Sequence, residues 1–388
     1  MLVLAGKNNI AVNALNYVVD NYVGDFSIIC NHTDDGHHGW QRSLKKTASD
    51  YGVREISLEE AYEEATVFIS LEYDRLVHIE KFKKARAYNI HFSLLPKYKG
   101  MYTSIWPLLN GEVTSGVTLH HIDNGIDTGS IIDQNKICLT ECDRASDLYR
   151  KYLASSFDLF KRQFKSMIAG DIYAEEQPEK GSTYYSKNSI DFSSLTIDLN
   201  QTAHCIARQI YAYSFREYQL PVVMQERIVE VEILDKRSSL KPGFVIKKEA
   251  DYLTLATIDY DIRLYIDRID RLEQFASCSV DYAKVLLKGL CGVHDRDKNG
   301  WSPIIIAAYH GNYEVVAFLL KKNANVNDVN RNGTSVLMYA KDYCLKSKDR
   351  SLFDFLIHKG ADINHKDFYG KTLVNYLTEN QKAFFSLK

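Results

Sequence analysis

The sequence lacks the marks of a disulfide-rich, metal-ribbon or membrane-spanning protein. Its seven cysteines are odd in number and include no Cys-x-x-Cys pair, so we expect neither a disulfide framework nor a zinc ribbon. Cys138 and Cys142 are the closest pair, and we expect both to be buried or half-buried thiols. No apolar run is long enough to cross a bilayer, and the sequence does not open on a charged segment with an apolar core. These absences predict a cytoplasmic protein without a membrane partner.

A surplus of charge of one sign is also missing. The 48 basic residues are balanced by 50 acidic residues, which argues against a nucleic-acid partner. His32, His37 and His38 share one polar segment, but carboxylate or cysteine ligands at suitable spacing do not accompany them. We therefore expect no metal.

The Gly-x-Gly-x-x-Gly fingerprint is absent, although strands and helices alternate in the first part of the chain. Gly6-Lys7-Asn8-Asn9 follows the first predicted strand without that fingerprint, which disfavours a nicotinamide or flavin dinucleotide. The alternation predicts an α/β fold with a doubly wound, mainly parallel sheet. The expected strands lie at 2–5, 26–30, 53–56 and 67–70, with helices at 10–21, 40–51 and from 58 onward.

Two short segments bring three polar residue types to the ends of predicted strands. Asn89 and His91 lie two apart at the end of a strand over 87–90, so both side chains should point to the same face. Asp127 lies in the turn 123–129, which follows a predicted strand over 116–122. Open α/β sheets bind ligands at such strand ends. We expect the three side chains to share one site.

An amide, an imidazole and a carboxylate together suit the transfer of a one-carbon acyl group to an amine. Histidine can accept the proton of the amine near neutral pH, and an asparagine amide can donate a hydrogen bond to the oxyanion. A carboxylate beside the histidine would orient the ring and stabilise the imidazolium. Taken singly, Asn89 could be a turn residue, His91 a satisfied core histidine and Asp127 a turn former.

The motifs around these residues resemble the formyltransferases that use N10-formyltetrahydrofolate. The similarity lies in Asn-x-His, Ser-Leu-Leu-Pro and Lys-Gly within 89–100, and in Thr-x-His-x-Ile-Asp-x-Gly-x-Asp-Thr-Gly within 116–134. The resemblance covers residues 1–270 and implies that Asn89, His91 and Asp127 are the catalytic triad. Segment 97–104 is most similar to the branch that formylates the amine of dTDP-linked 3-amino-3,6-dideoxyhexoses.

The resemblance also implies the residues around the two substrates and the biological setting. Formyltetrahydrofolate would contact Ser70, Leu71, Tyr73, Asp123 and Ile126. The sugar nucleotide would contact Lys97, Lys99, Met101, Tyr102 and Ser104. The family further implies a homodimer and a role in making surface polysaccharide such as O-antigen.

The middle of the chain predicts a second, smaller domain. A long amphipathic helix over 144–169 is followed by a polar connector, a helix over 199–215 and short strands at 229–234, 243–248, 252–257 and 262–266. We therefore expect a catalytic domain at 1–175, a small β-rich domain at 176–272 and a third domain at 273–388. Phe215, Arg216 and Tyr218 could hold the nucleotide base and diphosphate. Alternatively, Tyr211 and Phe215 form the buried stripe of a helix.

The last third of the chain repeats, which predicts an all-α ankyrin solenoid. Gly300, Gly333 and Gly370 recur at spacings of 33 and 37 residues, close to the ankyrin period of about 33. Trp301 lies at a normally exposed position, and we expect it to anchor a protein or a second nucleotide ligand. Alternatively, the repeats cover the β-rich domain or a subunit interface.

Two other functions stay open from the sequence. A methionyl-tRNA formyltransferase would use the same triad but should carry a basic small domain, because phosphate contacts dominate affinity for tRNA. An ankyrin-type binding protein with an inactive front domain is disfavoured by the intact triad.

Overall fold

The computed structural model describes residues 1–387, which form two compact units. The first unit is Met1–Leu195 with Tyr211–Phe215, and the second is Thr196–Ile210 with Arg216–Lys388. The connector after the long helix thus belongs to the first unit, beyond the expected boundary at 175. The small β-rich part and the ankyrin part, expected as separate domains, cluster in the second unit.

The first unit is built on a six-stranded sheet in the order β2-β1-β3-β4-β6-β7. The four strands from β2 to β4 are parallel, while β6 pairs antiparallel with β4 and β7 pairs antiparallel with β6. The prediction of a doubly wound, mainly parallel sheet is confirmed. The strands are β1 Leu2–Gly6, β2 Phe26–Cys30, β3 Val67–Leu71, β4 Arg86–His91, β6 Thr114–His121 and β7 Ile131–Cys138.

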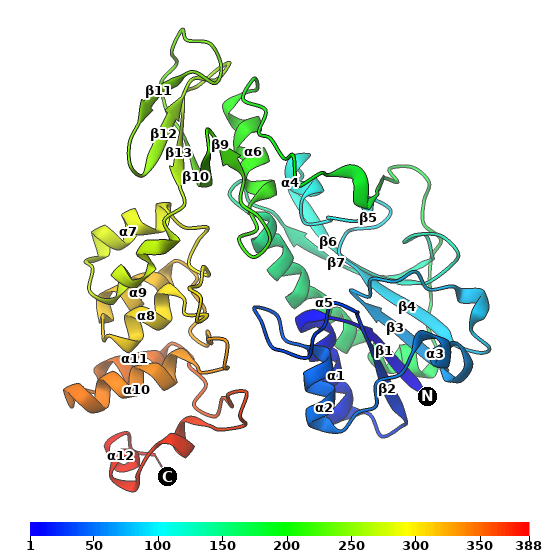
Figure 1. Ribbon diagram of the computed structural model, residues 1–388. Coiled ribbons are helices and arrows are strands. Elements are labelled where there is room, and N and C mark those ends of the chain that lie inside the picture. The colour runs from blue at the N-terminus through cyan, green and yellow to red at the C-terminus, as the bar shows by residue number, and fades with distance from the viewer. Residues whose placement is uncertain (388) are drawn as a thin grey trace. The chain divides into compact units, whose positions relative to one another are not determined.

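Helices cover both faces of this sheet because its strands are apolar on both sides. Figure 1 shows helices α1, α2, α3 and α5 around the sheet. Leu2 and Leu4 pack in a core with α1, α2 and α5, and Val3 and Ala5 pack in a second core with α3. The helices are α1 Asn8–Asn21, α2 Leu44–Tyr51, α3 Leu58–Glu64, α4 Trp106–Leu109 and α5 Ala145–Ala169. The long helix was expected one residue earlier. No helix in the described part of the chain combines the length and the apolar character needed to cross a membrane.

Two elements and the two closest cysteines differ from expectation. The predicted strand at 53–56 is a single bridge between Ile28 and Glu55. The helix expected from residue 40 begins at Leu44, because the Ser43 side chain accepts a hydrogen bond from Lys46 N and caps it there. Cys138 and Cys142 are exposed, so the expectation of buried thiols was wrong.

The second unit begins with one helix and a five-stranded antiparallel sheet in the order β11-β12-β13-β10-β9. These elements are α6 Ala203–Tyr213, β9 Val222–Val223, β10 Glu226–Ile233, β11 Val245–Lys248, β12 Tyr252–Leu255 and β13 Ile262–Ile266. Helix α6 starts four residues later than expected and its last three residues cluster with the first unit.

The ankyrin prediction is confirmed by three turns with the same hydrogen bonds. Gly300, Gly333 and Gly370 have φ angles of 80°, 77° and 73°, which glycine adopts without strain. In each turn an Asp or Asn three residues earlier accepts two backbone N–H bonds through its side chain, as Asp297 does from Asn299 and Trp301. The helices are η3 Ile269–Ala276, α7 Val280–Lys288, α8 Pro303–Tyr309, α9 Tyr313–Lys321, α10 Val336–Ser347, α11 Ser351–His358, η4 Leu373–Tyr376 and α12 Glu379–Phe384.

Candidate active site

Three adjacent strands bring an amide and an imidazole to one row of the first unit's sheet. Asn89 on β4 lies directly opposite Ser70 on β3 and His120 on β6. Residues opposite each other in a sheet project to the same face, and so do residues two apart on one strand. The sheet therefore places Ser70, Asn89, His91 and His120 together.

Asp127 reaches this row from the loop between β6 and β7. The Asp123 carboxylate closes that loop by accepting hydrogen bonds from Gly125 N and the Thr128 hydroxyl. Asp127 Oδ1 accepts from Asn89 Nδ2 at 3.2 Å, and its Oδ2 lies 3.4 Å from His91 Nδ1. The side chains of Asp127 and His91 are 12% and 9% exposed. The three residues singled out from the sequence thus meet in one buried cluster.

The contacts of His91 define which ring nitrogen can take up a proton. His91 Nε2 lies 2.8 Å from the Tyr98 carbonyl oxygen, and a carbonyl can only accept, so Nε2 carries a hydrogen. Nδ1 then faces Asp127 Oδ2. A proton that reaches Nδ1 creates an imidazolium whose new N–H points at a carboxylate.

His120 is a site residue that the sequence reasoning missed. Its Nδ1 lies 2.7 Å from the His121 carbonyl oxygen and therefore donates, which leaves Nε2 to accept from Asn89 Nδ2 at 3.1 Å. The two amide hydrogens of Asn89 are thus directed at His120 and Asp127. Donation to an oxyanion requires the exchange of one of these contacts. The Thr-x-His of the quoted motif was the signal for His120, since it lies in the strand before the Asp127 loop.

Asp127 is held in its charged form. Burial by itself would raise the pKa of Asp127, but the charge that His91 carries once it is protonated, the contacts with His120 and the hydrogen bond from Gly100 N outweigh burial and lower that pKa. A carboxylate with a lowered pKa is a weak base. The candidate proton acceptor of this cluster is therefore His91, with Asp127 in contact with it.

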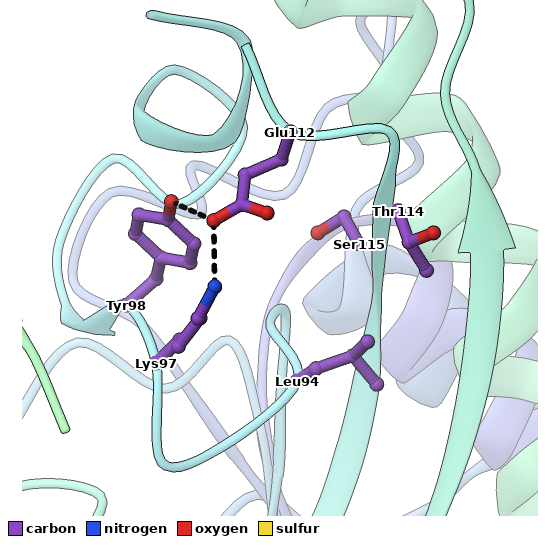
Figure 2. A pocket seen from close by; sticks show the side chains of 6 residues that line it. All are labelled: Leu94, Lys97, Tyr98, Glu112, Thr114 and Ser115. Atoms are coloured by element: carbon purple, nitrogen blue, oxygen red, sulfur yellow. Dashed lines mark hydrogen bonds and ion pairs between the residues drawn. The ribbon is translucent and has the colours of Figure 1, made fainter. Parts of the chain in front are cut away.

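The predicted sugar-contact segment supports the cluster with its backbone. Lys99 and Gly100 form β5 and pair with Tyr184 and Tyr185 of β8. The Lys97 ammonium and the Tyr98 hydroxyl both bind Glu112 Oε1 at 2.8 Å (Figure 2). Beside them lies a cavity of about 210 Å³, whose lining is Leu94, Lys97, Tyr98, Glu112, Thr114 and Ser115. Lys97 has an acidic partner within the protein, which the sequence did not indicate.

The other expected sugar contacts differ in exposure. Met101 is 46% exposed, while Tyr102 is half-buried and packs edge-on against Phe192. Lys99 and Ser104 are half-buried. Within this set, Met101 offers the most open surface.

The residues expected to contact the folate lie at the end of β3 and in the loop that carries Asp127. Ser70 and Leu71 are buried, Tyr73 is half-buried and Ile126 is exposed at the loop tip. Glu72, which the sequence reasoning passed over, accepts hydrogen bonds from Asn8 Nδ2 and the Tyr149 hydroxyl. Burial raises the pKa of Glu72 in spite of these bonds.

The residues expected to hold the nucleotide, Phe215, Arg216 and Tyr218, differ in burial and in their partners. Phe215 is 5% exposed and packs against Trp40 and Tyr149 in the core of the first unit, as the alternative of a buried helix stripe proposed. The Arg216 guanidinium binds Asp267 and Asp295 within the second unit, so its charge is already paired with two carboxylates. Tyr218 is exposed.

Trp301 is less open than its place in the repeat predicts. It is half-buried, and its ring lies 5.2 Å from Tyr309 and 4.6 Å from Tyr339. The described residues contain no group of three His, Cys, Asp or Glu side chains placed to hold a metal ion.

Comparison with known proteins identifies the families that the two parts of the chain resemble. The profile of the Formyl transferase family matches residues 42–162, and that of Ankyrin repeats (3 copies) matches residues 274–367. The crystal structure of an N-formyltransferase from Helicobacter canadensis, in complex with folinic acid and dTDP-3-aminofucose, is 40% identical. It matches 68% of this chain and 98% of its own, with a TM-score of 0.64. This chain belongs to the sugar N-formyltransferase family.

Other members and relatives of the family differ in substrate. WlaRD, a sugar 3N-formyltransferase solved with dTDP and 5-N-formyl-THF, is 39% identical over 68% of this chain and 97% of its own, with a TM-score of 0.64. Methionyl-tRNA formyltransferases from Clostridium tetani and Bradyrhizobium are 29% and 31% identical over 44% and 47% of this chain. The chain spans 55% and 58% of these two curated relatives, so it matches little more than half of their length.

Proposed function

We propose that this protein transfers the formyl group of N10-formyltetrahydrofolate to the amino group of a dTDP-linked amino sugar. The observation that carries the proposal is the contact of Asp127 with both Asn89 and His91 in one buried cluster. The 40% identity to a structure that holds folinic acid and a dTDP-3-amino sugar supports the same chemistry.

The residues of the cluster divide the reaction between them. His91 Nδ1 accepts the proton that leaves the attacking amine and gives it to the departing N10 of tetrahydrofolate as the bond from that nitrogen to the formyl carbon breaks. Asp127 Oδ2 stabilises the imidazolium between these two steps. Asn89 donates to the oxygen of the formyl group as charge develops there. Tyr98 keeps the opposite nitrogen of His91 protonated, so the base is always Nδ1.

The folate site fits the end of β3. The bound folate supplies an activated one-carbon acyl group. Ser70 lies directly beside Asn89 across the strand pair, so a pterin held at Ser70, Leu71 and Tyr73 would bring that group to Asn89. The Asp123 carboxylate holds the loop that carries Asp127, and Ile126 of the same loop offers the pterin an exposed apolar side chain.

The sugar is proposed to be a 3-amino-3,6-dideoxyhexose, made for surface polysaccharide such as O-antigen. One similar structure holds dTDP-3-aminofucose and the other is a sugar 3N-formyltransferase that holds dTDP, which supports the choice of a dTDP-linked 3-amino sugar. Lys99, Met101, Tyr102 and Ser104 are the proposed sugar contacts.

A mass assay with a panel of sugar nucleotides tests the function. The purified protein is incubated with N10-formyltetrahydrofolate and with dTDP-3-amino, dTDP-4-amino and UDP-4-amino sugars. We expect a mass gain equal to CO, fastest on a dTDP-3-amino sugar, because discrimination arises from contacts to the sugar in the transition state. No gain on any sugar would contradict the proposal and favour a binding protein with an inactive front domain.

A second candidate is methionyl-tRNA formylation, which the similarity to curated enzymes of that kind favours. Against it, the segment 200–271 contains as many acidic as basic residues, which gives no field for tRNA. Tight, salt-sensitive binding of initiator tRNA in a gel shift would support this candidate instead.

The ankyrin repeats are proposed to bind a ligand, either a protein or a second nucleotide, through the neighbourhood of Trp301. A homodimer is a further prediction, which light scattering of the purified protein would test.

A further inference from the structure

Gln177 links the segment after α5 to the loop that carries Asp127. The backbone of this segment is anchored two residues earlier, where Glu175 and Ile131 exchange two hydrogen bonds of 2.7 and 2.8 Å. Gln177 Nε2 then donates to the carbonyl oxygens of Asp127 and Gly129, each at 2.8 Å. A side chain 50 residues from Asp127 therefore holds its loop.

Asp127 needs support because its backbone has a φ of 55°, in the left-handed region. Residues other than glycine adopt this conformation at a cost, and it persists where surrounding contacts hold it. The direction of the carboxylate follows from this backbone, since Oδ1 must reach Asn89 while Oδ2 reaches His91. One hydrogen bond from Gln177 holds the backbone of Asp127, and the position of that backbone sets the direction of the Asp127 carboxylate.

We propose that Gln177 is a positioning residue for formyl transfer, whose two N–H donors fix the Asp127 loop and so aim the carboxylate at His91. This inference rests on the proposed function, because it assigns Gln177 to the same site. The amide oxygen Oε1 is buried without a hydrogen-bond partner in the described part of the chain, so the side chain acts through its donors.

A loop that loses these donors should place the carboxylate less accurately. The His91–Asp127 contact is 3.4 Å, and a misplacement of about 1 Å can cost about 100-fold in rate. Substrate contacts do not involve Gln177 in this proposal, so the loss should appear in kcat rather than in KM. The Glu175–Ile131 pair remains in place and should keep the segment folded.

The test compares Gln177→Met, which keeps the length of the side chain and removes both donors, with the wild-type enzyme. We expect single-turnover formyl transfer at saturating folate to fall about 10- to 100-fold while KM for the amino sugar changes less than about twofold. The same substitution in an Asp127→Asn background should cost less than about twofold more, because residues that act through one another are not additive. Gln163→Met, which removes a donor to Asp133 outside the site, is the matched control and should keep the wild-type rate.

The outcomes separate this inference from the function on which it rests. A wild-type enzyme that formylates an amino sugar while Gln177→Met is as fast would overturn the positioning role. An equal loss of rate in the wild-type and Asp127→Asn backgrounds would assign Gln177 a general structural role and overturn the positioning role. So would a fall in melting temperature large enough to leave Gln177→Met partly unfolded at the assay temperature. Failure of the proposed function would show as an inactive wild-type enzyme.

Discussion

At the scale of single residues, the site works because each polar group has a defined partner. Tyr98 fixes the tautomer of His91, His120 fixes the amide of Asn89, and Gly100 donates to Asp127. Buried polar groups that are fully hydrogen-bonded are rigid, which suits a general base, whereas Asn89 must exchange one of its two contacts before it can donate to an oxyanion. In the proposed reaction, Nδ1 is therefore the atom of His91 that accepts the proton.

Glu72 gives a prediction on pH and stability. Its pKa is raised in the folded protein, so the folded state binds its proton more tightly than the unfolded state. Glu72 therefore lowers the free energy of unfolding as the pH rises from the ordinary glutamate pKa of about 4.3 through the raised pKa of the folded state. We expect Glu72→Gln to raise the free energy of unfolding at pH 7–8, with the difference from wild type shrinking toward pH 5, as measured by urea denaturation.

Glu112→Gln is the control, because it should change the free energy of unfolding in the opposite direction. Hydrogen bonding to Lys97 and to Tyr98 lowers the pKa of Glu112 against the smaller effect of burial, so this carboxylate stabilises the fold above its ordinary pKa. Its substitution should destabilise the protein at neutral pH. A Glu72→Gln variant that is less stable than wild type at pH 8 would refute the account of Glu72.

The sequence predicted that Asn89, His91 and Asp127 lie together, but it did not predict the residues that contact them. Asn89 and His91 could be placed on one face because a strand has a period of two, and Asp127 because its turn residues are distinctive. His120, Gln177 and Glu72 depend on which strands become neighbours, and that depends on the whole sheet.

At the scale of elements, the loop over 97–100 is a structural part of the site. Its backbone supplies the Tyr98 carbonyl and the Gly100 N–H, and the Glu112 carboxylate anchors it from outside. A segment that reads as a source of sugar contacts thus also shapes the catalytic geometry. Side-chain chemistry in the sequence cannot reveal such backbone roles.

The first ankyrin repeat gives a prediction of its own. If the rings of Trp301, Tyr309 and Tyr339 hold a second nucleotide, calorimetric titration with dTDP should find two sites per chain, and Trp301→Ala should lose one. Stacking of a base is worth about 1–3 kcal/mol, which is enough for the site to disappear from the titration. Tyr313→Ala removes a comparable ring pair with Phe355 and should keep both sites. If the wild type and both variants each bind dTDP at one site per chain, the second-nucleotide hypothesis is contradicted, and a protein partner remains as the proposed ligand.

The positions of helices and strands were predicted where the hydrophobic periodicity is strong. They were missed where a capping residue decides at which residue a helix begins. Strand β2 and strand β13 lie where expected, since each is a short apolar or alternating run between turns. Helix α2 begins at the Ser43 cap, a local choice that a hydrophobic pattern does not show.

At the scale of the whole molecule, the ankyrin repeats and the small sheet form one body. Arg216 binds Asp267 beside the sheet and Asp295 in the ankyrin part, and Lys288 of α7 donates to the Tyr265 hydroxyl of β13 at 2.9 Å. Because Arg216 is largely buried, loss of one carboxylate would leave a charge poorly compensated. Removal of the residues after Arg271 therefore disturbs the sheet, and full-length variants are better probes of the repeats.

The domain boundaries were the least predictable feature. Composition marks the connector after α5 as a linker, yet its hydrogen bonds to the Asp127 loop and to β5 make it part of the first unit. Such long-range pairing leaves little trace in the local sequence.

The central claim is that His91, supported by Asp127, accepts the proton of an attacking amine. It is tested most directly by single-turnover formyl transfer to the preferred dTDP-amino sugar, with His91→Asn and Asp127→Asn compared to wild type. General-base catalysis contributes about 100- to 10,000-fold, so each variant should lose at least about 100-fold while remaining folded. Turnover within a few-fold of wild type in either variant would contradict the account.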